Sequence, residues 1–101
     1  MKLLVAITVA EYREQLEKFF SQHQVGFYNE FEVNGVRKME KPPHRVGNWF
    51  GQGGRPVNNI AFFSMVDDEQ ADNLLIELNK CKKEMPECDM HAYVINVEKG
   101  V

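Results

Sequence analysis

The sequence predicts an α+β domain in which two helices pack on a four-stranded antiparallel sheet. Two short segments, 2–10 and 59–66, are rich in β-branched and other apolar residues, as buried strands are. Two longer segments, 11–24 and the stretch that begins at Asp67, carry apolar residues at helical spacing. A chain of 101 residues has room for one hydrophobic core. We therefore expect a single domain that spans residues 1–101.

The first strand is expected at residues 2–10, which are almost continuously Leu, Val, Ile and Ala. The run is too short for a buried helix of ordinary length, and its apolar side chains fall on both alternating faces. This pattern predicts a strand that is covered on both sides. Residues 11–24 then predict an amphipathic helix that ends near Val25 and Gly26. The apolar side of this helix consists of Tyr12, Leu16, Phe19 and Phe20.

The second strand is expected at residues 27–33, where Glu30 and Glu32 fall on one face and apolar residues fall mainly on the other. A strand with an acidic face belongs at the edge of a sheet or in a projecting hairpin. The third strand, at residues 59–66, is apolar on both faces like the first. We therefore expect the first and third strands in the middle of the sheet.

The second helix is expected to begin at Asp67 and Asp68 and to end at Pro86. Asp67 is a favourable helix cap, and Gln70, three residues later, fits a variant of the capping box. Proline lacks the backbone N–H that would continue a helix, so Pro86 closes it. The last strand is expected at residues 91–97, where apolar residues again occupy alternate positions.

The order strand, helix, strand, strand, helix, strand is that of the ferredoxin-like βαββαβ arrangement. Both helices cover the same face of the sheet in this arrangement, so the other face should be polar if the chain is a monomer. The first and third strands are instead apolar on both faces. The sequence therefore predicts that the second face is buried against other copies of the chain in a closed oligomer.

A long loop is expected between the second and third strands, at residues 34–58. Five basic residues against one acidic residue give this segment a net charge of +4, and since the whole chain has −3, the rest carries −7. Such asymmetry indicates an anionic ligand or an acidic partner surface at the loop. The alternative is a solvated basic loop without a ligand. Because the chain as a whole is acidic, we expect no nucleic-acid partner.

The loop also contains an aromatic pair, Trp49 and Phe50. Loops longer than about 12 to 15 residues in compact domains are usually functional or disordered. Trp and Arg are also enriched among the residues that dominate binding energy at protein interfaces. The alternative is that the aromatic pair folds back on the domain and fixes the loop. The partner-binding residues expected from this pattern are His44, Arg45, Trp49, Phe50 and Arg55.

The sequence shows no nucleophile, base and acid in a pattern typical of catalysis, and we do not expect an enzyme. Cys81, Cys88 and His91 fall around the end of the second helix and the start of the last strand. Thiolate and imidazole ligands suit copper or zinc, so these three residues form a candidate metal site. The alternative is that both cysteines are reduced thiols, with Cys81 packed on the apolar stripe of its helix.

Four segments of the chain resemble the nitrogen-regulatory PII proteins and their PII-like relatives. MKLLVAI is similar to the family's first strand, and EFEVNGVRK stands where the family has an acidic strand and a turn at the base of a long loop. VDDEQADNLLIELNK resembles the second helix, and AYVINVEKG resembles the final strand. The resemblance covers nearly the whole chain. It implies a homotrimer whose long loops, the T-loops of the family, project from one side, with ligand sites in clefts between subunits.

The chain departs from the family at two ligand-binding places. Members that bind magnesium, ATP and 2-oxoglutarate have a Gln at the loop base, where this chain reads RKM, residues 37–39. The segment after the second helix, KKEMPECDMH, lacks the glycines that let backbone N–H groups approach a phosphate closely. The chain therefore resembles a divergent member with a changed ligand. The expected ligand-binding residues lie at the loop base and at the end of the second helix: Gly35, Arg37, Lys38, Lys82 and Lys83.

The resemblance implies a non-enzymatic signalling or sensor protein in the cytoplasm. Its ligand would be a small anion, for which an adenine nucleotide is a candidate, and the loop at 34–58 would regulate a partner such as a membrane transporter. The second hypothesis is a trimeric metal-binding protein that confers copper or zinc tolerance or senses these metals. No apolar run approaches the roughly 18 residues of a membrane span, so we do not expect the chain itself to be membrane-embedded.

Overall fold

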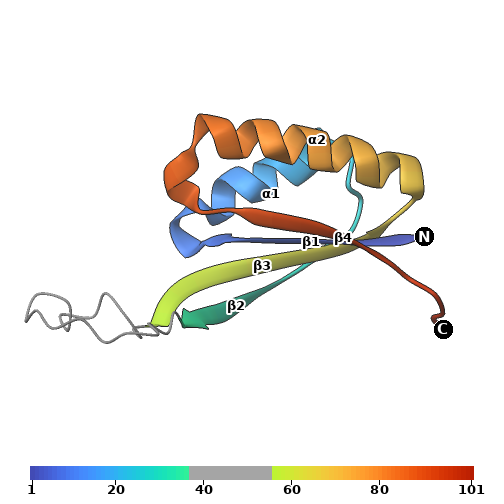
Figure 1. Ribbon diagram of the computed structural model, residues 1–101, viewed down its shortest axis with the longest axis horizontal. Coiled ribbons are helices and arrows are strands. Elements are labelled where there is room, and N and C mark those ends of the chain that lie inside the picture. The colour runs from blue at the N-terminus through green and yellow to red at the C-terminus, as the bar shows by residue number, and fades with distance from the viewer. Residues whose placement is uncertain (37–55) are drawn as a thin grey trace, which may run out of the picture.

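The computed structural model of this protein describes residues 1–36 and 56–101. In chain order the strands are β1 (Lys2–Val9), β2 (Asn29–Val36), β3 (Pro56–Val66) and β4 (His91–Asn96). The helices are α1 (Arg13–Gln22) and α2 (Asp68–Glu84), and two short 3-10 turns are η1 (Ala10–Tyr12) and η3 (Pro86–Cys88). Figure 1 shows that both helices lie on the same face of the sheet.

The four strands form one antiparallel sheet in the order β2-β3-β1-β4. The predicted ferredoxin-like α+β fold is therefore confirmed. The two strands that are apolar on both faces, β1 and β3, occupy the middle of the sheet. The acidic strand β2 lies at an edge, as its alternation of Glu and apolar residues indicates.

The hydrophobic core lies between the helices and the sheet. Leu4 and Phe62 project from the central strands, Phe20 projects from α1, and Leu74 and Leu78 project from α2. All five side chains are buried to 2 % exposure or less. The ring centroids of Phe20 and Phe62 are 5.4 Å apart, within the range of favourable aromatic pairs. The inward sides of the two helices thus fix their position over β1 and β3.

The predicted start of the second helix is confirmed in atomic detail. Asp67 is the N-cap of α2, and its Oδ1 atom accepts a hydrogen bond of 2.7 Å from the backbone N–H of Gln70. The first helix begins later than expected, because residues 10–12 form the separate turn η1. Pro86 ends α2 as expected and also begins η3. A proline is tolerated in the first turn of a helix because the backbone N–H groups there have no partner within the helix.

Strands β2 and β3 extend into the segment that the sequence assigns to the loop. Their antiparallel pairing continues through Asn34 with Asn58 and through Gly35 with Val57. Asn and Gly are typical of turns, which is why these residues suggested a loop. The hydrogen bonds of the sheet outweigh this weak local preference, so the described ends of the loop are Val36 and Pro56.

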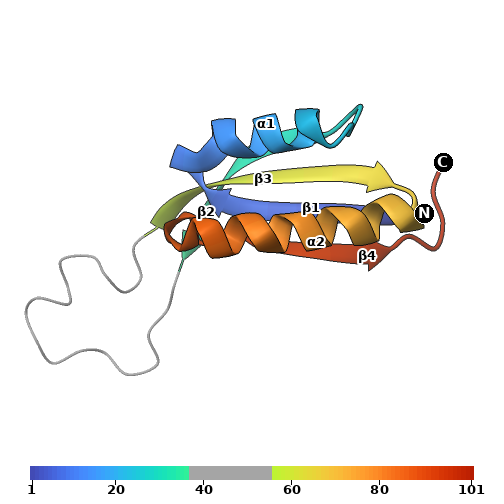
Figure 2. The same cartoon turned by 90° about the horizontal axis from the view of Figure 1, so that it is seen from above.

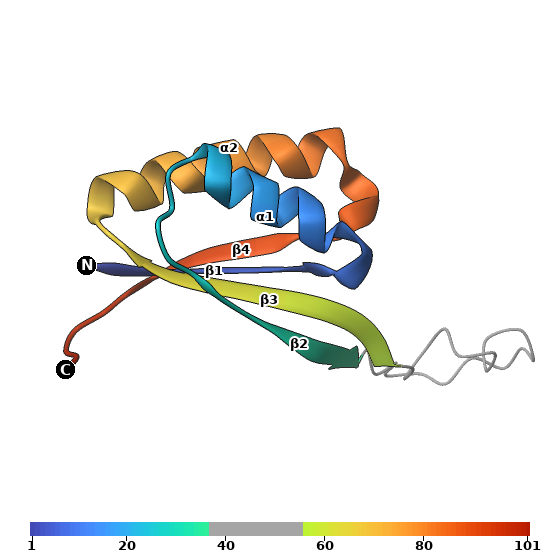
Figure 3. The same cartoon turned by 180° about the vertical axis from the view of Figure 1, so that it is seen from behind.

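The face of the sheet opposite the helices is apolar, and no described residue covers it (Figure 3). Alternate residues of all four strands point to this face, and the register places Val5 between Phe63 of β3 and Tyr93 of β4. Several large side chains on it are about half exposed: Phe31 at 47 %, Met65 at 51 %, Tyr93 at 54 % and Ile95 at 50 %. We call this surface the open face.

The two ends of the chain lie together, at the end of the domain away from the loop. The backbone N–H of Val97, just after β4, donates to the carbonyl oxygen of Met1 at 3.2 Å. The end of β2 and the start of β3 lie at the opposite end of the sheet (Figure 2). The loop base and the chain ends are therefore separated by the length of the strands.

Candidate functional site

The structure describes six of the predicted site residues. Gly35 lies in β2, and Cys81, Lys82 and Lys83 lie in the last turn of α2. Cys88 is the last residue of η3, and His91 is the first residue of β4. The other predicted ligand-binding and partner-binding residues lie outside the described residues: Arg37, Lys38, His44, Arg45, Trp49, Phe50 and Arg55.

Gly35 lies at the loop base, directly before Val36, the last residue of β2. It pairs with Val57 across β2 and β3. A Cβ atom at Gly35 would lie 2.7 Å from Nδ2 of Asn59, closer than real Cβ contacts allow. The contact is with the end of the flexible Asn59 side chain, so a larger residue at Gly35 would require that side chain to move.

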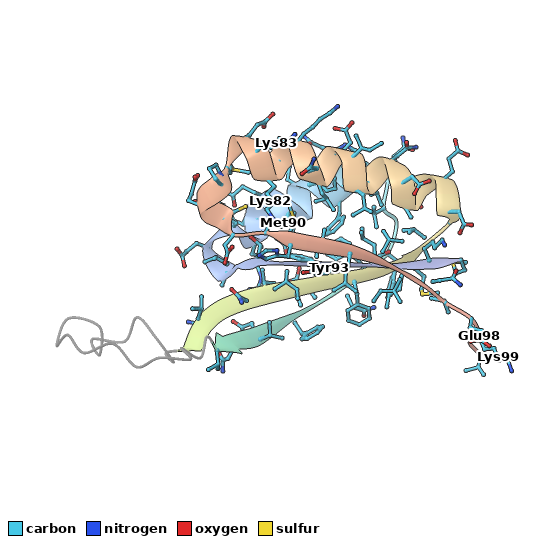
Figure 4. The ribbon with its side chains drawn as sticks, viewed as in Figure 1. Lys82, Lys83, Met90, Tyr93, Glu98 and Lys99 are labelled. Atoms are coloured by element: carbon cyan, nitrogen blue, oxygen red, sulfur yellow. The ribbon has the colours of Figure 1, made fainter. Side chains whose placement is uncertain are left out.

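Lys82 and Lys83 are both exposed but face different surroundings. Lys82 lines a groove of about 380 Å³ between α2 and β4, together with Asn79, Met90 and Ala92. Figure 4 shows Lys82 beside Met90 between helix and strand, whereas Lys83 lies on the outer side of α2. Both charges also suit the C-terminal end of a helix, where cations are favoured. Lys82 thus lines this groove, and Lys83 does not.

The groove has an apolar floor and a polar rim. Leu75, Leu78, Met90 and Ala92 supply apolar surface, and the side chains of Asn79 and Lys82 supply an amide and a positive charge. Its volume is within the range of small-molecule sites in proteins. Asn79 was not expected from the sequence, although its position three residues before Lys82 places both on the same side of a helix.

The predicted ligand-binding residues are divided between the two edges of the sheet. Gly35 belongs to β2 at one edge, whereas α2, which carries Lys82, contacts the central strand β1 and the strand at the other edge, β4. The C-terminal end of α2 and the loop base nevertheless lie at the same end of the domain (Figures 1 and 2). Within one chain, therefore, these residues share an end of the molecule but not a single cleft.

The three predicted metal ligands do not form one group. Cys81 and Cys88 both line a cavity of about 30 Å³, but His91 does not, and its Nε2 atom lies 3.4 Å from Oδ1 of Asp89. Across residues 1–36 and 56–101, no three His, Cys, Asp or Glu side chains come together in a way that could hold a metal ion. Burial, with the nearby carboxylates of Glu84 and Glu77, raises the pKa of the Cys81 thiol.

An acidic cluster joins α1 to the edge strand β2 and was not expected from the sequence. Nε of Arg13 lies 3.2 Å from Oε1 of Glu30, an ion-pair distance, although the two atoms do not form a hydrogen bond. A hydrogen bond to the same Glu30 carboxylate raises the pKa of Glu17, with smaller contributions from burial and from the charge of Glu30. The cluster explains why an acidic strand face can point toward the helix layer.

No protein-family model and no curated protein matches this chain. No helix among the described residues is both long and apolar enough to cross a membrane. A crystal structure described as that of a PII-like signaling protein from Thermus thermophilus is similar to the chain with a TM-score of 0.63. The match covers 95 % of this chain and 85 % of that chain, with 22 % sequence identity. The chain therefore has the same fold as this PII-like protein.

Proposed function

We propose that the chain is a PII-like signalling or sensor protein that works as a homotrimer. It binds a small anionic ligand, for which an adenine nucleotide is the first candidate, in clefts between subunits. The protein is cytoplasmic, and its basic loop at 34–58 regulates a partner such as a membrane transporter. The protein itself catalyses no reaction. The shared fold with a protein described as a PII-like signaling protein supports this proposal.

The observation that carries the proposal is the open face. Phe31, Met65, Tyr93 and Ile95 form an apolar surface that crosses the whole sheet. Soluble monomers rarely expose contiguous apolar surface of this kind, and such surfaces commonly mark interaction sites. Further copies of the chain are suitable occupants, because the helices already cover the other face and the loop base stays clear at one end.

The division of the predicted ligand residues fits a site between subunits. Arg37 and Lys38 follow directly after β2, at one edge of the sheet, and Lys82 borders the groove at the other edge. A neighbouring copy that places its β2 edge beside this β4 edge would bring the two cationic sets to one cleft. Cations are suited to phosphate groups, and the apolar floor beside Met90 and Ala92 is suited to a base.

Two measurements test the proposal separately. Light scattering on the purified protein at micromolar concentration should give the mass of three chains, and a monodisperse monomer would remove the whole proposal. Calorimetry with ATP, ADP, AMP and cyclic nucleotides should give heat with at least one of them. If the protein is a trimer but gives no heat with any of these nucleotides, the proposed assembly stands and a nucleotide is excluded as the ligand.

The partner-binding residues can be tested through the trimer. A double variant, Arg45→Ala with Trp49→Ala, should keep the mass of the trimer but lose cross-linking to a membrane protein in the source cells. A matched variant with Gln22→Ala and Lys18→Ala, at two exposed positions of α1, should retain the cross-link. Equal cross-linking by both variants would show that the loop residues do not contact the partner.

The hydroxyl of Ser64 has a structural role, which agrees with the absence of catalysis in the proposal. Ser64 is buried in β3, and its Oγ atom donates a hydrogen bond of 2.6 Å to the carbonyl oxygen of Phe27. This bond holds the segment before β2 against β3. A hydroxyl engaged in this way is not aimed at a substrate.

A further inference from the structure

Four sulfur-containing side chains line one small cavity between α2, the turn η3 and the core. They are Cys81, Met85, Cys88 and Met90, and the cavity has a volume of about 30 Å³. The chain has five methionines and two cysteines in total, so more than half of its sulfur atoms belong to residues 81–90. We call this place the sulfur cavity.

The first two sulfur residues converge because of the helix. Cys81 and Met85 are four residues apart, so their side chains lie one turn apart on the same side of α2. The backbone N–H of Met85 donates to the carbonyl oxygen of Cys81 at 3.0 Å, which holds Met85 in helical register at the C-cap. Both side chains pack against the core.

The other two sulfur residues converge because of the turn that follows. The N–H of Cys88 donates to the carbonyl oxygen of Met85 at 3.1 Å, and Asp89 adopts a left-handed conformation with φ of 48°. This turn leaves Glu87 and Asp89 exposed and directs Cys88 and Met90 inward, at 4 % and 2 % exposure. Helix and turn together therefore bring all four sulfur-containing residues to the lining of one cavity.

Three side chains with oxygen or nitrogen atoms also line the sulfur cavity: Thr8, Tyr12 and Gln15. The hydroxyl of Thr8, which also lines the cavity, already donates to the carbonyl oxygen of Cys88 at 2.8 Å. In the described part of the chain no third His, Cys, Asp or Glu side chain joins the two cysteines as a possible ligand. The soft donors at the cavity are two thiols and two thioethers, a set that selects Cu(I) over hard cations, whereas the phenol of Tyr12 and the amide of Gln15 are hard groups.

The size and access of the sulfur cavity suit a single ion. A volume of about 30 Å³ exceeds the roughly 10 to 15 Å³ that a water molecule needs, but it is too small for an organic ligand. Cys88 and Met90 are buried, whereas Cys81 and Met85 are only partly buried. An ion can therefore reach the thiol of Cys81 from solvent before the inner donors bind it.

We propose that the sulfur cavity is a binding site for a soft monovalent cation, Cu(I), held by Cys81 and Cys88 with Met85 and Met90 as additional donors. Each cysteine thiol loses its proton and forms one Cu–S bond, so that one Cu(I) ion replaces two protons and no oxidant is required. The thioethers bind as neutral donors without releasing a proton. This site lies within one chain and is independent of the proposed ligand cleft between subunits.

The test is an anaerobic titration of the full-length protein with Cu(I) in competition with bicinchoninate. The unsubstituted protein should take up one ion per chain, and Cys81→Ser should weaken the affinity by at least about 100-fold, more than loss of a supporting residue costs. Met90→Leu, which conserves volume and apolar character, should weaken it by about tenfold. Ser21→Ala, at an exposed position of α1, is the control and should leave the affinity unchanged.

X-ray absorption on the copper-loaded protein supplies a second measurement. The spectrum should show sulfur ligands only, and circular dichroism should show that each variant is folded. Absence of tight Cu(I) binding, equal affinity of Cys81→Ser and the unsubstituted protein, or nitrogen ligands in the spectrum would each overturn the site. Since the trimer mass and nucleotide heats are measured without copper, failure here is distinct from failure of the proposed function.

Discussion

The side chain of Thr8 is hydrogen-bonded to the backbone of Cys88, eighty positions later in the chain. Thr8 Oγ1 donates to the Cys88 carbonyl oxygen at 2.8 Å, and Thr8 is 1 % exposed. The bond joins the central strand β1 to the turn after α2 at a point that water does not reach. It satisfies a carbonyl group that would otherwise be buried without a partner.

We expect Thr8→Val to lower the free energy of unfolding by about 1 to 3 kcal/mol, since the shape is retained while the carbonyl oxygen of Cys88 loses its donor. Urea denaturation followed by circular dichroism measures the change. Thr8→Ser is the control, because it keeps the hydroxyl and removes only a methyl group. The hydrogen bond would have no stabilising role if the valine variant were as stable as the unsubstituted protein.

The cluster at Glu17 and Glu30 predicts a dependence of stability on pH. The hydrogen bond with Glu30, followed by burial and the charge of Glu30, raises the pKa of Glu17 above its ordinary value of 4.5, and Arg13 opposes the shift. A raised pKa means that the folded state holds the proton more tightly. This contribution to stability is fully present below about pH 4.5 and is lost as the pH rises through the raised pKa.

Glu17→Gln should therefore stabilise the protein above that pH range, because the amide can donate to the Glu30 carboxylate at every pH. The gain should be at most about 0.5 kcal/mol, since solvent screens the pair. Thermal melts at pH 4 and pH 7 measure the effect. Glu98→Gln, at an exposed position after β4, is the control for the loss of one carboxylate. If the change in stability between pH 4 and pH 7 were the same for both variants, the pair of Glu17 and Glu30 would not be its cause.

The open face predicts a variant that separates folding from assembly. Ile95 is 50 % exposed in the single chain, so Ile95→Glu should leave the fold intact. In an assembly that covers the open face, the same carboxylate would be buried without a partner, which costs several kcal/mol. Sedimentation should show monomers for this variant and trimers for Gln22→Glu, which adds the same charge on α1. A trimeric Ile95→Glu protein would place the interface elsewhere.

The two neighbouring lysines form a matched pair for the ligand site. Lys82 borders the groove between α2 and β4, whereas Lys83 lies on the outer side of the helix (Figure 4). We expect Lys82→Glu to weaken nucleotide binding by about tenfold or more, which corresponds to about 1.4 kcal/mol, and Lys83→Glu to weaken it much less. Calorimetry with the nucleotide that gives the largest heat measures both. If both variants lost the same nucleotide affinity, the lysines would act through long-range electrostatics and not through contact of Lys82 with the nucleotide.

The fold could be predicted from the sequence because its signals are local. Glu30 and Glu32 on one side of a strand indicate an edge, and Asp67 followed by Gln70 indicates a helix start; both agree with the structure. The extension of β2 through Gly35 could not be predicted in this way, because turn-forming residues there are overridden by pairing with β3.

The candidate sites were harder to predict because they depend on how elements pack. Successive helical residues point about 100° apart, so only contact with β4 distinguishes Lys82 from Lys83. Similarly, Cys88 and His91 are close in sequence, but the left-handed turn at Asp89 places Cys88 inside and leaves His91 exposed. Met85 and Met90 gave no signal of their own, since apolar residues near a helix end usually indicate core packing.

The hydrogen bond between Val97 and Met1 has a practical consequence for experiments on the intact protein. Both termini lie at the far end of the strands from the base of the loop (Figure 2). A biotinylated peptide at either terminus would therefore anchor the molecule to a sensor chip with the ends of β2 and β3 directed into the flowing solution. Surface plasmon resonance in this orientation would present the loop to partners without a spacer.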